Sequence, residues 1–194
     1  MRLDAPAKVP SVNETEMKNK TLLLSLALAC YLLATTTKVL CAAESSTAIA
    51  QSDARLAKLE KLVLNYVNEA RSKEGLKTLA WNEKLATVAR AHCAEMRDKE
   101  YFAHESPTEN LREPLDRYNA VFGDTPRLLA ENIFRSWGNR HELSDADAKR
   151  AHDSLMNSPG HRANILLPGI TQIGIGFVAN AKGDLWVTQM FLKL

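Results

Sequence analysis

Two histidines and one glutamate stand out in this sequence as side chains that could do chemistry. His104 and His161 both lie in stretches that contain Ser and Pro, which is typical of the loops that display functional residues. Glu131 lies in a run of leucine, alanine and isoleucine. A carboxylate buried in such a run is costly unless a partner pairs with it. We therefore expect Glu131 to face a partner.

Two chemistries suit these residue types. Two neutral imidazoles can ligate Zn²⁺ or another divalent metal, with a carboxylate as third ligand or as the group that orients a histidine. Alternatively, Glu131 and one histidine form a hydrogen-bonded pair without metal, in which the carboxylate raises the histidine pKa. His104 and His161 are thus candidate metal ligands, but no cofactor is required by the sequence.

Other familiar chemistries lack their motifs. The chain has no HExxH zinc pair, Gly-rich phosphate loop, GxSxG elbow or CxxC pair. Cys93 lies on the apolar stripe of a predicted helix, which indicates a buried small hydrophobe. His92 and His152 also fall in predicted helices, as structural or exposed residues, and His141 lies in a charged stretch that we expect at the surface.

The N-terminal region has the pattern of an export signal. Residues 17–43 combine a basic start, a short apolar run and a small-residue exit site, which predicts a signal peptide. The apolar run is shorter than the roughly 20 residues of a membrane span, although an uncleaved anchor is the alternative. Residues 1–16 would be an upstream extension or a misassigned start, 44–51 a linker, and 52–194 the domain. We expect a secreted or cell-envelope protein.

The cysteines and charges narrow the class further. Of the three cysteines, only Cys93 remains once residues 1–43 are removed, so the core must stabilise the domain without an internal disulfide. Removal of the same residues leaves 20 basic and 20 acidic side chains. The balanced charge offers no footprint for nucleic acid or an anionic membrane.

Local patterns predict most elements. A helical stripe runs from Ser52 to a stop near Gly75, and Asn82 can cap a second helix that fades by residue 100. Pro114 suits the first turn of a short helix that stops at Gly123. A capping-box pattern at Ser144 opens a helix that the Asn-Ser-Pro-Gly stretch halts.

The C-terminal end changes period from 3.6 to 2. Residues 173–177 alternate bulky residues with Gly174 and Gly176, and residues 185–192 form a second strand-like run, which predicts a hairpin. Helices followed by this hairpin indicate an α+β fold, with helices packed on a small antiparallel sheet.

Four segments occur in an order that resembles the CAP superfamily of cysteine-rich secretory, antigen-five and pathogenesis-related (SCP-like) proteins, in its bacterial branch without disulfides. They are Phe-Ala-His at 102–104, Ala-Glu-Asn-Ile at 130–133, Asn-Ser-Pro-Gly-His-Arg-Ala-Asn-Ile-Leu at 157–166 and Ile-Gly-Ile-Gly at 173–176. The resemblance covers roughly residues 59–191. It implies a three-layer α-β-α sandwich, and it implies that His104, Glu131 and His161 converge in one cleft.

The chain also departs from the family pattern. The fuller family pocket holds two His and two Glu, and the second Glu follows a Trp by three residues. Here Leu155 stands at the Trp position and Ser158 at the Glu position. The Ser158 hydroxyl is thus a further cleft candidate, and a Ser–His–Glu triad would be an analogy only.

Three functions are compatible with the resemblance and the residues. The first is a non-catalytic exported module that binds an extracellular, envelope or host ligand, whether protein, lipid or peptide. The second is a metal-assisted, peptidase-like hydrolase that uses His104, His161 and Glu131. The third is a carrier of lipid or sterol-type apolar ligands. The missing second carboxylate weighs against the second.

Overall fold

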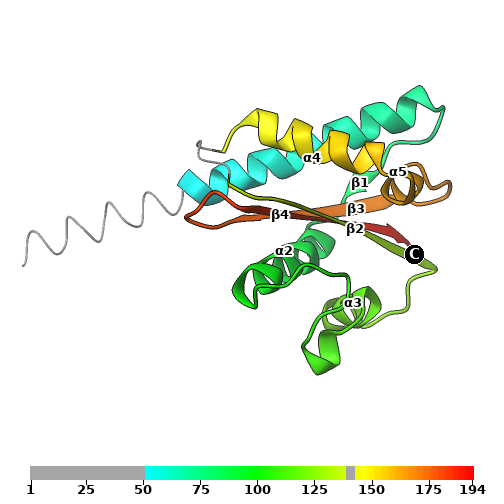
Figure 1. The fold of residues 1–194 in the computed structure, drawn as a ribbon. Helices are drawn as coiled ribbons and strands as arrows, with labels where there is room; N and C mark the ends of the chain where they lie inside the picture. The colour runs from blue at the N-terminus through cyan, green and yellow to red at the C-terminus, as the bar shows by residue number, and fades with distance from the viewer. Residues whose placement is uncertain (1–50, 139–142) are drawn as a thin grey trace, which may run out of the picture. The chain divides into compact units, whose positions relative to one another are not determined.

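A four-stranded sheet forms the middle layer of the molecule, with helices on both of its faces (Figure 1). The structure is a computed structural model and describes residues 51–138 and 143–194. The predicted signal peptide, most of the predicted linker and His141 lie outside these residues. Ser52–Leu194 form one compact unit. No helix in the described part of the chain is long and apolar enough to span a membrane.

The sheet has the strand order β1-β3-β4-β2. The predicted hairpin is present as β3 (Gln172–Ala179) and β4 (Leu185–Lys193), which pair antiparallel. The edge strand β2 (Leu128–Ser136) pairs antiparallel with β4. The sheet is antiparallel as predicted except at one edge, where β1 (Ala80–Trp81) pairs in parallel with β3. This two-residue strand lies where the chain passes between two helices, too short a stretch for a strand period to show.

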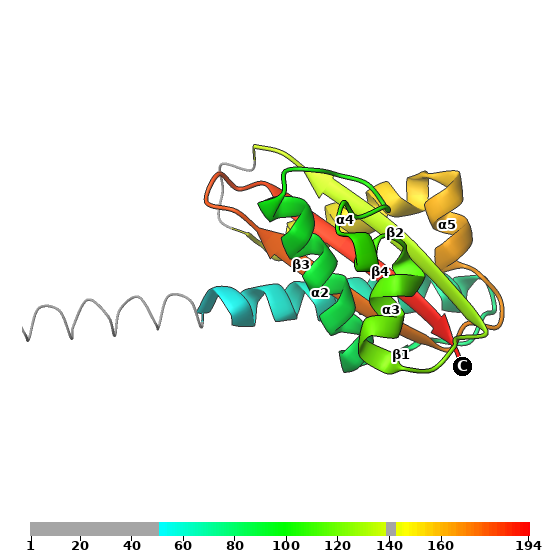
Figure 2. The same cartoon turned by 90° about the horizontal axis from the view of Figure 1, so that it is seen from below.

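The helices divide between the two faces, which makes the α-β-α sandwich. One face carries the helix of residues 51–73, α4 (Asp145–Asn157) and α5 (Pro159–Ile165). The other carries α2 (Glu83–Asp98) and α3 (Pro114–Phe122), which lie in front of the sheet in Figure 2. A short 3₁₀ helix, η1 (Glu109–Leu111), precedes α3.

Each face of the sheet has its own apolar core because strand side chains alternate between the faces. Towards the helix of residues 51–73 and α4, the strands present the side chains of Ile173, Ile175, Phe177, Val187 and Phe191. Towards α2 and α3, β4 presents Met190 and Leu192. Cys93 of α2 is buried on this second side, as predicted, and burial raises the pKa of its thiol to about 12.

The helix caps and helix ends predicted from the sequence are present in the structure. The Asn82 side chain accepts a hydrogen bond from the Leu85 amide at 2.9 Å and so caps α2. Ser144 and Asp147 form the reciprocal capping box of α4. Gly75 and Gly123 follow their helices with φ values of 71° and 74°, which glycine adopts without strain.

The bare face of β3 lets α2 approach the sheet closely. A Cβ atom at Gly174 would lie 2.3 Å from the backbone nitrogen of Ala86, and one at Gly176 would lie 2.4 Å from that of Arg90. No side chain fits at either position, so both glycines are required for contact between helix and strand backbones. The contact fixes α2, and therefore the loop after it, against the sheet.

Candidate functional site

The candidate site lies along the edge strand β2, where both helical layers reach the sheet. Successive residues of a strand point to opposite faces, and Glu131 and Asn132 are successive residues in the middle of β2. Glu131 pairs in register with Met190 on the α2/α3 side, whereas Asn132 pairs with Gln189. The two neighbours therefore make contacts to different layers.

Glu131 is buried and has three hydrogen-bond contacts with donors around it. His104 Nδ1 lies 2.8 Å from Glu131 Oε1. Arg117 Nη2 donates to both carboxylate oxygens, at 3.1 Å to Oε1 and 2.9 Å to Oε2. The side chains of Arg117 and Glu131 are only 4% and 2% exposed, so this ion pair is almost completely removed from water. The partner expected for Glu131 is thus an arginine as well as a histidine.

Arg117 is also a structural anchor for the loop that carries His104. Its Nη1 donates to the carbonyls of Leu111 and Arg112, both at 3.0 Å, and its Nη2 donates to the His104 carbonyl at 2.9 Å. One guanidinium therefore connects α3, the loop before it and Glu131. The planar fork of five N–H groups suits this role better than a lysine ammonium would.

The Glu131 contact determines how His104 faces the solvent. A carboxylate oxygen accepts, so Nδ1 of His104 carries the proton in this bond, and in the neutral ring Nε2 is left as an acceptor. The His104 side chain is 49% exposed. The site therefore presents one oriented imidazole edge to the solvent.

The opposite wall of the site comes from α5. Asn132 Nδ2 donates to the His161 carbonyl at 3.0 Å, and Asn164 Nδ2 donates to Asn132 Oδ1 at 2.9 Å. These bonds attach the first turn of α5 to β2. Burial, and then the charge on His104, lowers the pKa of His161. The two imidazoles thus lie close enough to influence each other electrostatically.

A second hydrogen-bonded cluster supports the loop from the side of α2. His92 is buried, and its Nε2 lies 3.2 Å from the Ala103 carbonyl and 3.9 Å from Glu131 Oε1. Burial lowers the pKa of His92. It is therefore a neutral, structural histidine next to the candidate site.

Glu95 of α2 accepts hydrogen bonds from further polar side chains in and beside the loop that carries His104. Its carboxylate accepts hydrogen bonds from Tyr101, Ser106, Thr108 and Lys99. Burial opposes its ionisation, but these hydrogen bonds outweigh burial and lower the pKa of Glu95 to about 2. The His104 loop is thus built around a charged carboxylate.

Ser158 takes a different place from the other candidates. It is both the C-cap of α4 and the N-cap residue of α5, and its carbonyl accepts from the Arg162 amide at 2.8 Å. Within the described residues, its hydroxyl makes no hydrogen bond to His104, Glu131 or His161. The described part of the chain therefore offers no contact for a Ser–His–Glu triad.

Two features of the site differ from the sequence predictions. His161 does not lie in a loop but in the first turn of α5, because Pro159, which the sequence pattern indicates as a helix stop, is the N1 residue of a new helix. The sequence patterns also miss Arg117 and the proximity of His92. The signal for Arg117 is indirect, since a buried glutamate requires a cation and Arg117 sits on the inner face of the short helix predicted from Pro114.

The donor set does not suit a three-ligand metal site. Both Glu131 oxygens already accept hydrogen bonds, and the Arg117 guanidinium lies where a metal bound to that carboxylate would meet a positive charge. In the described ranges, no three His, Cys, Asp or Glu side chains are placed to hold a metal ion. Only two imidazoles remain, fewer than the three protein ligands typical of a catalytic zinc.

Comparison with known proteins identifies relatives of this chain. The model of the cysteine-rich secretory protein family matches residues 64–191. The protein YkwD of Bacillus subtilis is 36% identical over 158 residues, which are 81% of this chain and 56% of that protein. The membrane protein YlbC of the same organism is 30% identical over 135 residues, 69% of this chain and 34% of that protein. The chain thus spans about half or less of the length of these relatives.

Solved structures agree with the fold. An extracellular protein of Bacillus anthracis that contains an SCP domain is 30% identical, with a TM-score of 0.58 over 71% of this chain and 41% of that one. An outer surface protein of Borrelia burgdorferi is 18% identical, with a TM-score of 0.59 over 70% of this chain and 92% of that one. The second likeness concerns the fold alone.

Proposed function

Because the chain belongs to the cysteine-rich secretory protein family, we propose that it is an exported, non-catalytic binding module whose ligand enters the cleft between His104 and His161. The extracellular placement of the Bacillus anthracis relative supports export. The ligand is an extracellular, envelope or host molecule, and the exposed imidazole edge of His104 would bind its polar groups.

One observation carries the non-catalytic part of this proposal. Among the described residues, the carboxylate that contacts His104 is already committed to Arg117 and to His104 itself. A hydrolase needs a nucleophile or an activated water within hydrogen-bond reach of a base, and the Ser158 hydroxyl has no such contact in the described part of the chain. These residues are thus suited to orient a ligand and to form hydrogen bonds with it.

The hydrolase alternative retains one observation in its favour. A histidine oriented by a buried carboxylate is the base half of many hydrolytic sites. The apolar-carrier alternative gains less, because charged side chains line the pockets of the described structure. Both alternatives predict outcomes that differ from those of the binding module.

A hydrolysis screen tests the proposal. The full chain and the His104→Ala and His161→Ala variants would be compared on casein, a fluorogenic peptide library and chromogenic esters, with and without EDTA. We expect no turnover that depends on either histidine. A rate that disappears in His104→Ala would favour the hydrolase instead.

A peptide array gives the positive test. We expect the chain to bind a defined subset of immobilised peptides, and His104→Ala to lose that subset. Lys77→Met, a surface change away from the cleft, is the control and should bind as the parent does. Binding that His104→Ala leaves intact would place the recognition surface elsewhere.

A further inference from the structure

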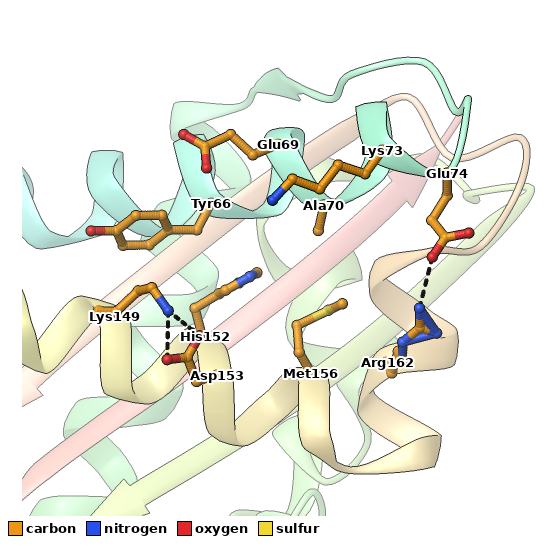
Figure 3. Close-up of a pocket in the computed structure, with 10 residues that line it drawn as sticks. All are labelled: Tyr66, Glu69, Ala70, Lys73, Glu74, Lys149, His152, Asp153, Met156 and Arg162. Atoms are coloured by element: carbon orange, nitrogen blue, oxygen red, sulfur yellow. Dashed lines mark hydrogen bonds and ion pairs between the residues drawn. The ribbon is translucent and has the colours of Figure 1, made fainter.

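A pocket lies between the helix of residues 51–73 and α4, on the face of the sheet opposite α2 and α3 (Figure 3). Its volume is about 330 Å³, at the small end of the range for small-molecule sites. His104, Glu131, His161 and Ser158 are not among its lining residues. It is therefore a separate candidate site, and its chemistry is independent of the function proposed for the cleft.

A buried imidazole with an unpaired ring nitrogen lines this pocket. His152 is only 7% exposed, and its Nδ1 has no hydrogen-bond partner in the described part of the chain. Its ring lies 5.6 Å, centroid to centroid, from that of Tyr66 on the facing helix. Buried polar atoms are nearly always paired in proteins, so an orphan atom at a pocket wall suggests that a ligand supplies the partner.

The charges around the pocket divide into those that form ion pairs and those that do not. Lys149 pairs with Asp153 at 2.6 Å, and Arg162 pairs with Glu74 at 2.8 Å. These four charges neutralise one another in two ion pairs (Figure 3). They leave little attraction for a ligand of high charge.

Glu69 and Lys73 are the remaining charges of the lining. Their spacing of four residues is the one at which a glutamate and a lysine of the same helix usually pair. Within the described residues, neither side chain has a hydrogen bond or an ion pair. Figure 3 shows the Lys73 side chain extending along the gap between the helices. Both side chains are exposed to solvent, so the pocket offers one positive and one negative charge that no described protein group pairs with.

We propose that this pocket binds a free amino acid with an apolar side chain. Its carboxylate would accept hydrogen bonds from Lys73 and His152, and its ammonium group would pair with Glu69. Its side chain would lie against Tyr66 and Met156, which supply apolar surface on the two helices. A zwitterion is the ligand whose two charges match the two that the protein leaves open.

The state of His152 agrees with this role. Burial lowers its pKa; among the charged groups that face it, Asp153 and Glu69 raise the pKa whereas Lys149 and Lys73 lower it. The ring is therefore neutral at pH 7 and has one N–H to donate. A fatty acid would satisfy Lys73 but leave Glu69 without a partner, and its long chain would exceed the small pocket.

Ligand titrations on the full chain, followed by NMR through the ring signals of His152, test the proposal. The probes are L-phenylalanine, 3-phenylpropionate, which lacks the ammonium group, and 2-phenylethylamine, which lacks the carboxylate. We expect L-phenylalanine to bind and each analogue to bind about tenfold more weakly, because each loses a charge-assisted hydrogen bond.

Variants then assign the two charges. Lys73→Met and Glu69→Gln should each weaken L-phenylalanine binding by about five- to tenfold, whereas Lys77→Met, outside the pocket, should not. His104→Ala should bind L-phenylalanine as the parent does, which separates this site from the cleft.

Three results would overturn the proposal. Equal binding of 3-phenylpropionate and L-phenylalanine would show a simple anion site. Binding of palmitate but not of L-phenylalanine would show a lipid groove. If no probe moves the His152 signals, the pocket does not bind this class of ligand.

Discussion

At the scale of single residues, the Arg117–Glu131 pair is the structural centre of the candidate site. Both side chains are almost fully buried, and one guanidinium contacts the carboxylate, the His104 carbonyl and two further carbonyls. Burial of such a pair does not guarantee stability, but removal of one partner leaves the other charge buried and unpaired. The pair therefore makes a sharp target for mutation.

Arg117→Met should lower the free energy of unfolding by about 3–5 kcal/mol, because Glu131 would remain buried without its cation. Urea unfolding followed by circular dichroism measures this change. The double variant Arg117→Met with Glu131→Gln should recover part of the loss, since its buried group carries no charge. A loss below about 1 kcal/mol in the single variant would contradict the role assigned to the pair.

The interaction between the two cleft histidines makes a second prediction. The charge on His104 contributes to the lowered pKa of His161, after the larger effect of burial. His104→Ala removes that charge, so the pKa of His161 should rise when measured by NMR titration. Ser158→Ala changes no charge and should leave it unchanged. A fall in the pKa of His161 in His104→Ala would mean that the imidazoles do not repel each other.

At the scale of secondary-structure elements, the sequence predicts features that depend on neighbouring residues and misses those that depend on contacts distant in the sequence. The helices α2, α3 and α4 can be predicted because their caps lie within a few residues of their ends. The strand β2 cannot, because Glu131 and Asn132 interrupt its apolar pattern and its pairing with β4 is distant in sequence. Arg117 escapes prediction for the same reason, since its partner belongs to another element.

The junction of α4 and α5 shows how one signal can have two meanings. Pro159 and Gly160 indicate the end of a helix, which is correct for α4. The same proline begins α5, and Ser158 serves as the boundary of both helices. The hydrogen bond from the Arg162 amide to the Ser158 carbonyl, at 2.8 Å, shows that the chain continues as a second helix and not as a loop.

The contact of α2 with β3 predicts opposite effects for two glycine substitutions. Gly174→Ala should destabilise the protein by about 1–3 kcal/mol, because the new Cβ would meet helix backbone that cannot move aside cheaply. Gly160→Ala is the matched control, since no atom lies within 4 Å of its Cβ position. In α5 it should be neutral or stabilise by up to about 1 kcal/mol. Thermal unfolding of both variants tests this, and equal effects would contradict the close contact.

At the scale of the whole molecule, buried histidines link stability to pH. His92 and His152 are 1% and 7% exposed, and burial lowers the pKa of each below its ordinary value near 6.5. When the pH falls below about 6.5, the unfolded chain binds protons that the folded chain does not. The free energy of unfolding must therefore fall with the pH.

We expect the loss between pH 7 and pH 5 to be about 1–3 kcal/mol, since each histidine contributes at most about 1.4 kcal/mol per pH unit. Urea unfolding at several pH values measures it, and His152→Phe should reduce the slope. Glu95 affects stability at lower pH. Because its pKa is about 2 in the folded chain, its contribution to the free energy of unfolding is lost only as the pH falls below the ordinary value near 4.5. A free energy of unfolding that stays constant from pH 7 to pH 5 would refute the assignment.

The two glycines of β3 also limit which arrangements the folding chain can adopt. From Gly174 to Gly176 the contact advances by two strand residues, about 6.6 Å, and on α2 it advances from Ala86 to Arg90, about 6.0 Å of helix. The advance along β3 and the advance along α2 almost match between these two contacts. The mismatch would grow if the contact continued further along both elements. A hairpin slipped by one residue would present isoleucine and phenylalanine to the helix backbone, and α2 could not dock. The two glycines therefore select the strand register. Only the correct register lets α2 pack on β3 and brings the loop with His104, which follows α2, to its position.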